Sequence, residues 1–310
     1  MNDSNEKLSV CLLVYNHGHS LDKVITSILE QTISSFEFVI SDDCSTDNSW
    51  HIIEKYALLF KNIKALKTSK NLGMAANANF AISHATGKYV ALLHHDDDLT
   101  PLLLEKWLKV IKLSEKIAFV FCEYKLENGL LYHKKMGYKF MAKMNGKMFL
   151  NKYLLKYWGC PVRGTTLIRK KYFDEIGGFY EKFGMLADVD LWMRLSSKWE
   201  VGYVNEPLIE VRQERPESYP KIYKDFSWER RFILFDIHSS NINRDNYPNY
   251  FKFIIKRFVF RNRVSIEIIK WLIYGIIKGK AFIIKSFPSC GHKDEIIFSK
   301  IFANFIKAIY

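Results

Sequence analysis

The chain has 310 residues, of which 48% are hydrophobic and 15% aromatic, and this composition supplies a packed core and excludes a disordered protein. Its five cysteines include no C-x-x-C pair, which predicts free thiols in a reducing compartment and excludes both a disulfide framework and a zinc site. The net charge of +13 belongs mainly to residues 221–310, where 17 Lys and Arg face 7 Asp and Glu and leave a net +10.

The start of the chain bears on where the protein works. Residues 1–7 are polar and lead directly into a strand, so we expect no secretory signal. No apolar run reaches about 18 residues, so we expect no transmembrane helix. Together with the free thiols, these features predict a cytoplasmic protein.

The first part of the chain alternates between strand and helix patterns. Short apolar runs with β-branched residues predict buried strands, and apolar residues at helical spacing predict the helices between them. The predicted strands are 8–15, 36–40, 63–66 and 89–93, and the predicted helices are 21–29, 49–60, 75–84 and 102–113. Four such alternations predict an α/β fold with a doubly wound, mostly parallel sheet flanked by helices.

Two acidic clusters each follow a predicted strand. Asp42 and Asp43 close the second strand, and the triplet 96–98 follows the fourth. Because the carboxyl ends of parallel strands meet at one edge of a sheet, both clusters should line the crevice where open α/β sheets bind ligands. Neighbouring carboxylates repel each other by about 4 kcal/mol per pair at about 4 Å and an effective dielectric near 20, so a cation is expected between them.

The triplet at 96–98 predicts a divalent metal site. Mg²⁺ and Mn²⁺ prefer hard oxygen ligands and complete their coordination with phosphate oxygens. The sequence has no G-x-G-x-x-G and no G-x-x-x-x-G-K-[ST], so a nucleotide would hold its phosphates through the metal and not through a glycine-rich loop. A solvated acidic turn in front of the helix near Pro101 is the alternative interpretation.

A third acidic position lies further along the chain. Residues 158–169 have the pattern of a loop entering a strand, followed by a short helix at 171–176 that a Gly-Gly pair stops. Another helix is predicted over 187–195, with Asp188 in its first turn. A carboxylate there can act as a simple helix cap, so by itself it does not identify a catalytic group.

Five short motifs stand in a fixed order along the chain. They are residues 10–16, 41–47, 71–73, the pair 96–97 with Pro101, and 188–194. Each is weak alone, but five in order and at this spacing are specific. Over roughly residues 8–215 the chain resembles the family 2 glycosyltransferases, which are inverting, nucleotide-sugar-dependent enzymes with the GT-A fold.

The resemblance implies a nucleotide site built from the first three motifs. Tyr15 would lie beside the base, and Asp43 would accept the hydrogen bond from uracil N3–H. Asp42 would support the site. Asn71 and Gly73 belong to the same implied nucleotide site.

The resemblance also implies how the diphosphate is held. Asp96 and Asp97 match the residues that hold a divalent metal, here Mn²⁺ or Mg²⁺, against the donor. His94 stands where the family commonly has Asp; imidazole suits Mn²⁺ better than Mg²⁺, so His94 is a candidate ligand, and a histidine without a role is the alternative. Arg212 is a candidate charge-assisted donor to the diphosphate, with a solvated surface arginine as the alternative.

Asp188 matches the general base of the family, which takes the proton of the acceptor hydroxyl. Ala187 stands where Glu often precedes that base, a change expected to affect acceptor positioning more than chemistry. With one base and no enzyme nucleophile, the resemblance implies a single displacement that inverts the anomeric configuration. A bound metal would neutralise the departing UDP as a Lewis acid.

The resemblance therefore predicts a glycosyltransferase. We expect one sugar to move from UDP-hexose or UDP-N-acetylhexosamine to a hydroxyl of a lipid-linked or surface-polysaccharide acceptor, as in lipopolysaccharide or capsule polysaccharide biosynthesis. A dTDP- or GDP-sugar stays open as donor. Two alternatives also stay open: a catalytically impaired protein that binds sugar nucleotides or acts as a scaffold, and a nucleotidyltransferase.

The chain is expected to divide near residue 220. Residues 1–220 would form the catalytic domain, with a nucleotide-binding half at about 8–115 and an acceptor half at about 116–220. Residues 221–310 would form a helical, basic and aromatic-rich region. Between residues 251 and 285, nine basic residues stand against a single acid, Glu267.

This C-terminal region has the pattern of a basic amphipathic helix, with breaks expected at Gly275 and Gly279. The predicted cationic stripe consists of Lys252, Lys256, Arg263, Lys270, Lys278 and Lys285. Such a stripe favours a peripheral position on anionic lipid at the inner face of the plasma membrane. The alternative is a helical hairpin that packs on the catalytic domain. No nucleic-acid partner is expected, because no binding module accompanies the charge, and a homodimer stays open.

Overall fold

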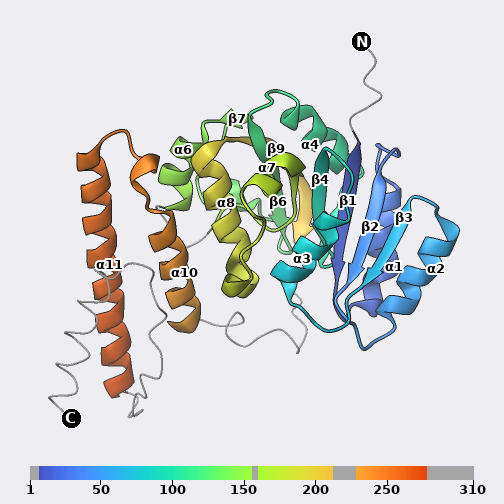
Figure 1. The fold of residues 1–310 in the computed structure, drawn as a ribbon, viewed down its shortest axis with the longest axis horizontal. Helices are drawn as coiled ribbons and strands as arrows, with labels where there is room; N and C mark the ends of the chain where they lie inside the picture. The colour runs from blue at the N-terminus through green and yellow to red at the C-terminus, as the bar shows by residue number, and fades with distance from the viewer. Residues whose placement is uncertain (1–6, 156–159, 212–227, 278–310) are drawn as a thin grey trace. The chain divides into compact units, whose positions relative to one another are not determined.

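The computed structural model describes residues 7–155, 160–211 and 228–277 (Figure 1). The chain forms two compact units, Met1–Glu214 and Arg215–Tyr310. The domain boundary expected near residue 220 and the candidate residue Arg212 both lie outside the described residues.

A mixed sheet forms the centre of the first unit. In the described residues it has nine strands in the order β3-β2-β1-β4-β8-β6-β9-β5, with β7 paired to β9. Most of the paired residues are parallel, in β1 with β2 and β4, in β2 with β3, and in β6 with β9. The strands are β1 Leu8–Val14, β2 Glu37–Asp42, β3 Ile63–Lys67, β4 Tyr89–His94, β5 Asp97–Leu99, β6 Ile117–Leu126, β7 Lys143–Met144, β8 Thr166–Arg169 and β9 Glu200–Val211.

The predicted α/β alternation of the N-terminal half is confirmed. Its helices are α1 Gly18–Leu29, α2 Ser49–Leu59, α3 Met74–Ser83 and α4 Leu103–Ile111, each close to its predicted range. Helix α3 covers one face of the sheet and α1 lies on the other (Figure 1). Val10 and Leu12 of β1 are fully buried in one core with Ile25 of α1 and Trp107 of α4. Because helices cover both faces of the sheet, the side chains on both faces are buried. This explains why these strands are apolar along their whole length.

Two long strands of the second half were not predicted from the sequence. Strand β6 is buried over most of its length and pairs in parallel with β9, for example Phe121 with Tyr203. Strand β8 lies between β4 and β6 and is antiparallel to both. The pairing shifts register between Cys122 and Glu123. Strands β6 and β9 therefore depend on pairing partners far away in the sequence. No local pattern reveals those partners.

The acidic triplet is partly built into the sheet. Asp97 is the first residue of β5, which pairs antiparallel with β9 and sets Asp97 opposite Val211. Its side chain is buried, with 1% of the residue exposed, so a solvated acidic turn is the wrong interpretation for this residue.

Helices complete the second half of the first unit. The two that were predicted are present, α7 at Lys170–Glu175 and α8 at Ala187–Lys198. The shorter ones are α5 Tyr132–Lys135, α6 Gly146–Phe149, a π-helix at Leu150–Leu154 and a 3₁₀ helix at Glu181–Leu186. Helix α8 contacts β6 and the π-helix and thereby carries Asp188 on the second half of the sheet.

The described part of the second unit is a helical pair. It consists of α10 Trp228–Asn241 and α11 Tyr250–Ile277, with a short 3₁₀ helix at Arg244–Asn246 between them. The imidazole of His238 stacks on the ring of Phe260, with the centroids 6.3 Å apart and the planes 4° from parallel. Helix α11 continues through Gly275, so the break predicted there is wrong, and Gly279 lies outside the described residues. Among the described helices, none is long and apolar enough to span a bilayer.

In the predicted cationic stripe of α11, Lys252 and Arg263 are exposed. Lys256 is half-buried, and burial together with Arg263 lowers its pKa. Burial and the charges of Lys256 and Arg263 also lower the pKa of His238 on α10. Within the stripe, Lys256 therefore lies toward α10, whereas Lys252 and Arg263 remain exposed. Lys278 and Lys285 of the stripe, and the side chain of Lys270, lie outside the part of the chain that the structure describes.

Candidate active site

Two loops at the carboxyl ends of β1 and β2 hold each other in place. The backbone N–H of Asn16 donates to Oγ of Ser45 at 2.9 Å, and the N–H of Thr46 donates to Oδ1 of Asn16 at 2.8 Å. Asn16 and Cys44 both have a left-handed backbone, with φ of 49° and 58°, which lets each loop turn sharply where its strand ends. Tyr15, predicted to lie beside the base, is 37% exposed at this edge.

Asp43 is buried and organises the loop that contains Asn71. Its Oδ1 accepts hydrogen bonds from the Leu72 N–H at 2.8 Å and the Thr68 hydroxyl at 3.1 Å, and its Oδ2 accepts one from the Gly73 N–H at 2.8 Å. Gly73 needs its positive φ of 83° for this contact. A carboxylate offers about four acceptor positions, so Asp43 keeps capacity for a ligand N–H. No sequence pattern pointed to Thr68.

Asp42 lies deeper than Asp43, at the end of β2. Its Oδ2 accepts a hydrogen bond from the Ser45 N–H at 3.1 Å, and among the described residues its Oδ1 has no partner. Burial raises the pKa of this carboxyl and so favours its neutral form. The supporting role of Asp42 at the base site stays a prediction.

Asp97 is held by two residues that the sequence did not mark as functional. Arg163 donates from Nη2 to Oδ1 of Asp97 at 3.0 Å, and the Thr165 hydroxyl donates to Oδ2. Burial raises the pKa of Asp97, and the Arg163 guanidinium opposes that shift because it favours the charged form. Protein groups thus engage both carboxylate oxygens. The predicted binding of metal and nucleotide by Asp97 stays a prediction.

The register of β4 and β8 places the Arg163 loop beside the acidic triplet. Leu92 stands opposite Thr166, so the residues before Thr166 run beside those after Leu92. Gly164 lies against His94, and a β-carbon at position 164 would meet Nε2 at 2.3 Å. Burial lowers the pKa of His94 and keeps the imidazole neutral. Metal ligation by Nε2 of His94, which stays a prediction, would require the loop to move.

The remaining acids of the triplet differ in their partners. Asp98 forms an ion pair with Lys23 at 2.9 Å. In the described part of the chain no hydrogen bond from another residue reaches the Asp96 carboxylate, and no three His, Cys, Asp or Glu side chains are grouped to hold a metal ion. Mg²⁺ at phosphate sites is often held by one or two carboxylates, with phosphates and waters as its other ligands. Asp96 could hold such an ion, for which phosphate or water oxygens would have to supply the other ligands.

Several carboxylates favour the charged form of the Arg163 guanidinium. Burial lowers the pKa of this guanidinium, but Asp97 and Asp96 raise it, and the net effect is an increase. Asp188, in the first turn of α8, raises it as well. Burial and the charge of Asp188 also raise the pKa of the Cys160 thiol. The charges of Asp96, Asp97 and Asp188 therefore favour the protonated guanidinium, and the role of Asp188 as general base stays a prediction.

Aromatic side chains support the Arg163 loop. The guanidinium carbon of Arg163 lies 5.5 Å from the ring centroid of Tyr124, and that ring stacks on Tyr132 with the centroids 4.7 Å apart. The buried His133 places Nε2 2.7 Å from the Pro161 carbonyl oxygen. These contacts give the loop a firm base on β6 and α5.

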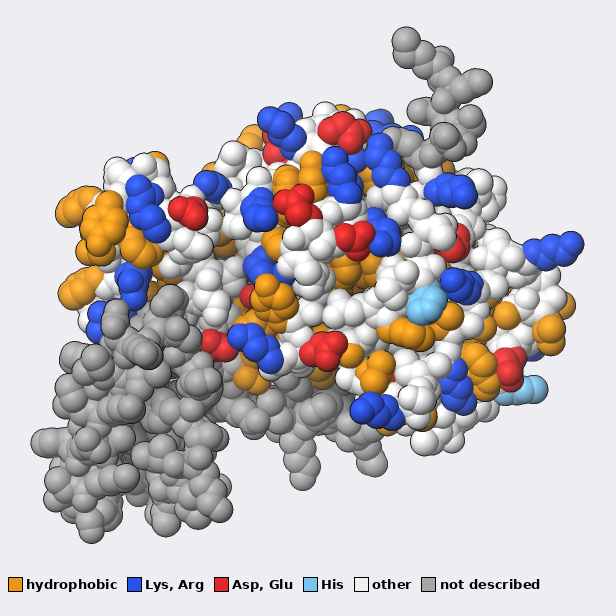
Figure 2. All heavy atoms as spheres, in the orientation of Figure 1, with side chains coloured by type: hydrophobic (Ala, Val, Ile, Leu, Met, Phe, Trp, Pro, Cys, Tyr) orange, Lys and Arg blue, Asp and Glu red, His pale blue; other side chains and the backbone are white. Residues whose placement is uncertain are grey.

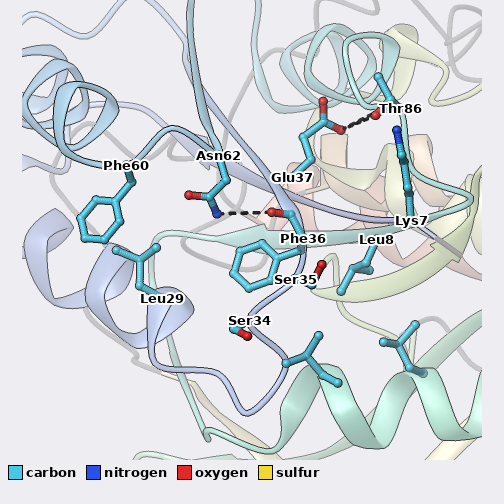
Figure 3. A pocket seen from close by; sticks show the side chains of 12 residues that line it. Lys7, Leu8, Leu29, Ser34, Ser35, Phe36, Glu37, Phe60, Asn62 and Thr86 are labelled. Atoms are coloured by element: carbon cyan, nitrogen blue, oxygen red, sulfur yellow. Dashed lines mark hydrogen bonds between the residues drawn. The ribbon is translucent and has the colours of Figure 1, made fainter. Parts of the chain in front are cut away.

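A pocket of about 830 Å³ lies elsewhere in the first unit (Figure 3). Leu8, Phe36 and Glu37 line it, at the amino-terminal ends of β1 and β2, and the Thr86 N–H donates to Glu37 at 2.8 Å. Ligands of open α/β sheets bind at the opposite, carboxyl ends of the strands. We therefore place the candidate active site at the acidic edge.

Residues 9–177 match the family model described as glycosyl transferase family 2. Because this match covers more than half of the chain, the chain belongs to glycosyl transferase family 2. EpsE of Bacillus subtilis is 28% identical over 223 residues, which are 68% of this chain and 75% of that protein. GlyG, a glycosyltransferase of Streptococcus pneumoniae serotype 4, is 25% identical over 239 residues, or 74% of this chain and 78% of that protein.

Solved structures show the same fold. S. aureus TarS 1–349 in complex with UDP-GlcNAc has a TM-score of 0.59 and 20% identity, covering 76% of this chain and 66% of that chain. The mannosyltransferase PcManGT of Pyrobaculum calidifontis, in complex with GDP-Man and Mn²⁺, has a TM-score of 0.59 and 16% identity, covering 98% and 86%. At these identities the likeness concerns the fold, which is that of GT-A glycosyltransferases.

Proposed function

We propose that the protein is an inverting hexosyltransferase. It moves one sugar from UDP-hexose or UDP-N-acetylhexosamine to a hydroxyl of a lipid-linked or surface-polysaccharide acceptor. Family membership supports the transfer of a sugar from a nucleotide donor. The neighbours solved with UDP, UDP-GlcNAc and GDP-Man also support a nucleotide-sugar donor.

The observation that carries this proposal is the register of β4 and β8, which sets the Arg163 loop beside the acids that follow β4. Asp96 follows β4 and Asp188 begins α8, so the two acids come from different halves of the first unit. Both raise the pKa of Arg163. The register, together with the electrostatic effect of both acids on Arg163, supports one site in which a donor diphosphate and an acceptor hydroxyl meet.

In the proposed reaction each acid has its own task. Asp43 and the loop at 71–73 bind the base, and Asp96 holds Mn²⁺ or Mg²⁺. When bound, the ion stabilises the negative charge of the leaving UDP. Asp188 takes the proton of the acceptor hydroxyl as its oxygen attacks the anomeric carbon. Because no side chain bonds to the sugar, one displacement inverts the anomeric configuration.

Replacing Asp188 tests the proposal. In full-length Asp188→Asn, turnover of UDP-sugar with acceptor should fall at least about 100-fold, because a general base contributes that much or more. UDP affinity, measured by calorimetry with Mn²⁺, should stay as in the wild type. Asp174→Asn, which removes an exposed carboxylate of α7, is the matched control and should keep full turnover.

The same assay separates the alternatives. A catalytically impaired binding protein would bind UDP but show no turnover even as wild type. A nucleotidyltransferase would release pyrophosphate, whereas a glycosyltransferase releases UDP. Full turnover in Asp188→Asn would contradict the assignment of the base.

We also propose that α11 binds an anionic membrane surface, at the inner face of the plasma membrane. Five large apolar residues of one helical face are exposed, and Figure 2 shows hydrophobic side chains gathered with Lys and Arg over the start of this helix. They are Phe251 at 71%, Ile254 at 41%, Ile255 at 45%, Phe258 at 63% and Val259 at 53%. Residues 250–266 carry five Lys and Arg and no acid. An apolar helix face flanked by cations suits anionic headgroups.

A further inference from the structure

Two arginines of the first unit, the buried Arg169 and the half-buried Arg163, use their N–H groups very differently. Arg169 is fully buried, and its Nε, Nη1 and Nη2 all donate, to three backbone carbonyls and to Glu115. The side chain of Arg163 is 31% exposed, and its Nη2 donates to Asp97. Its Nε is buried without a hydrogen-bond partner among the described residues. Arg169 is thus a structural arginine, whereas Arg163 retains unused donors.

The surroundings of Arg163 fix its position without consuming those donors. Asp97 holds one end of the guanidinium, and the Tyr124 ring lies 5.5 Å from its central carbon. The charges of Asp96 and Asp188 raise the pKa of the guanidinium and so favour its charged form. A guanidinium is a rigid fork of N–H groups that matches phosphate oxygens.

We propose that Arg163 binds the diphosphate of the sugar donor through its unused N–H groups. This inference rests on the proposed function, because a nucleotide-sugar donor is what would bring phosphates to this edge. Asp97 acts as a positioning residue that orients the guanidinium. His94 and Gly164 position the same loop through their contact.

The role has a defined place in the reaction. The acceptor oxygen forms its bond to the anomeric carbon while its proton passes to Asp188. The bond from the anomeric carbon to the β-phosphate oxygen breaks, and its electron pair stays on that oxygen. Arg163 then donates hydrogen bonds to a leaving group whose charge has increased, which favours the transition state over the ground state.

A matched pair of variants distinguishes diphosphate binding by Arg163 from a role limited to neutralising the charge of Asp97. Removing Arg163 alone would leave a buried carboxylate without its partner and destabilise the fold. We therefore compare Asp97→Asn with the double variant Arg163→Gln/Asp97→Asn. Both lack the charge at position 97, but only the double variant lacks the guanidinium.

The measurement is calorimetric binding of UDP and of uridine, with Mn²⁺ and with EDTA. The double variant should bind UDP about 10- to 100-fold more weakly than Asp97→Asn in both solutions, which corresponds to one or two charge-assisted hydrogen bonds. Uridine, which has no phosphate, should bind both variants equally. Equal UDP affinity of the two variants would overturn the inference and leave the proposed function standing.

A second comparison covers the case in which the double variant does not fold. Arg163→Lys keeps a positive charge beside Asp97 but loses the fork, so UDP should bind several-fold more weakly than in the wild type, while uridine affinity is unchanged. UDP affinity equal to that of the wild type would contradict the inference. A wild-type protein that binds no UDP would instead refute the proposed function itself.

Discussion

Gly164 lies directly against the imidazole of His94, so that a β-carbon at position 164 would stand 2.3 Å from Nε2. The contact follows from the antiparallel pairing of β4 and β8, which sets Leu92 opposite Thr166. It joins the loop that carries Arg163 to the acidic triplet, although the two segments are far apart in the sequence. The absence of a side chain at position 164 is therefore part of the candidate site.

Gly164→Ala should destabilise the protein by about 1–3 kcal/mol, because the added methyl group overpacks a buried contact. Urea unfolding followed by circular dichroism measures this change. His94→Ala removes the clashing ring, so Gly164→Ala should cost much less in that background. Equal costs in the two backgrounds would show that the His94 contact is not the cause.

Asp43→Asn should weaken both the fold and nucleotide binding. The amide nitrogen that replaces one oxygen cannot accept a hydrogen bond, so a buried N–H loses its partner at a cost of about 1–3 kcal/mol. UDP affinity should fall as well, because the base would lose its acceptor. Thr68→Val removes a neighbouring donor and keeps the carboxylate, so it should cost about 1 kcal/mol and leave UDP affinity unchanged. UDP binding by Asp43→Asn at wild-type strength would contradict base recognition by Asp43.

The buried His238 should make stability depend on pH. Burial, with the charges of Lys256 and Arg263, lowers its pKa to about 3. In the unfolded chain the pKa of His238 is near 6.5, so that state takes up a proton first as the pH falls. The contribution of neutral His238 to the free energy of unfolding is therefore complete above about pH 6.5 and is lost as the pH falls toward 3. The slope is about 1.4 kcal/mol per pH unit.

The control for this prediction is His238→Gln, which cannot take up a proton. The difference between the thermal unfolding midpoints of wild type and variant should be smaller at pH 5 than at pH 7.5. Acidification destabilises the wild type, because its unfolded state takes up a proton at His238, whereas the variant has no such proton. Parallel curves for the two proteins would show that His238 does not titrate in this way.

Replacing two exposed aromatic residues of α11 tests the membrane surface. Phe251→Ser/Phe258→Ser should reduce co-sedimentation with vesicles of phosphatidylglycerol and phosphatidylcholine by about 10-fold or more, since each buried aromatic contributes about 1.5–3 kcal/mol. UDP binding should not change. The matched control is Leu58→Ser/Leu59→Ser on α2, where both leucines are exposed but lie in the other unit. Unchanged sedimentation of the α11 variant would refute the surface.

The N-terminal half of the fold was predictable because each of its signals is local. Val10 and Leu12 belong to an apolar run that is buried on both faces, and the helix spacing of Ile25 is set by its own neighbours. Strands β6 and β9 were missed because their parallel pairing, with a register shift near Glu123, depends on residues far apart in the chain. The apolar run of β6 carries no periodicity that separates a buried strand from a buried helix, and polar residues and a proline interrupt β9.

The candidate site divides in the same way. Asp43, Asp96 and Asp188 stood out because carboxylates at strand ends and helix starts recur at recognisable spacing. Arg163 and Thr165 did not, since nothing near them in the sequence announces Asp97 as a partner. An arginine in a loop has the same local pattern whether it is solvated or held against a buried carboxylate.

Local order in the chain was enough to establish the alternating α/β scaffold, the family resemblance and the acidic groups at its edge. Only the fold decided which of those acids already has a protein partner. A buried carboxylate pairs with the groups that the sheet register brings within hydrogen-bonding distance. That register placed Arg163 and Gly164 beside residues 94–97, and no property of either segment by itself contains this information.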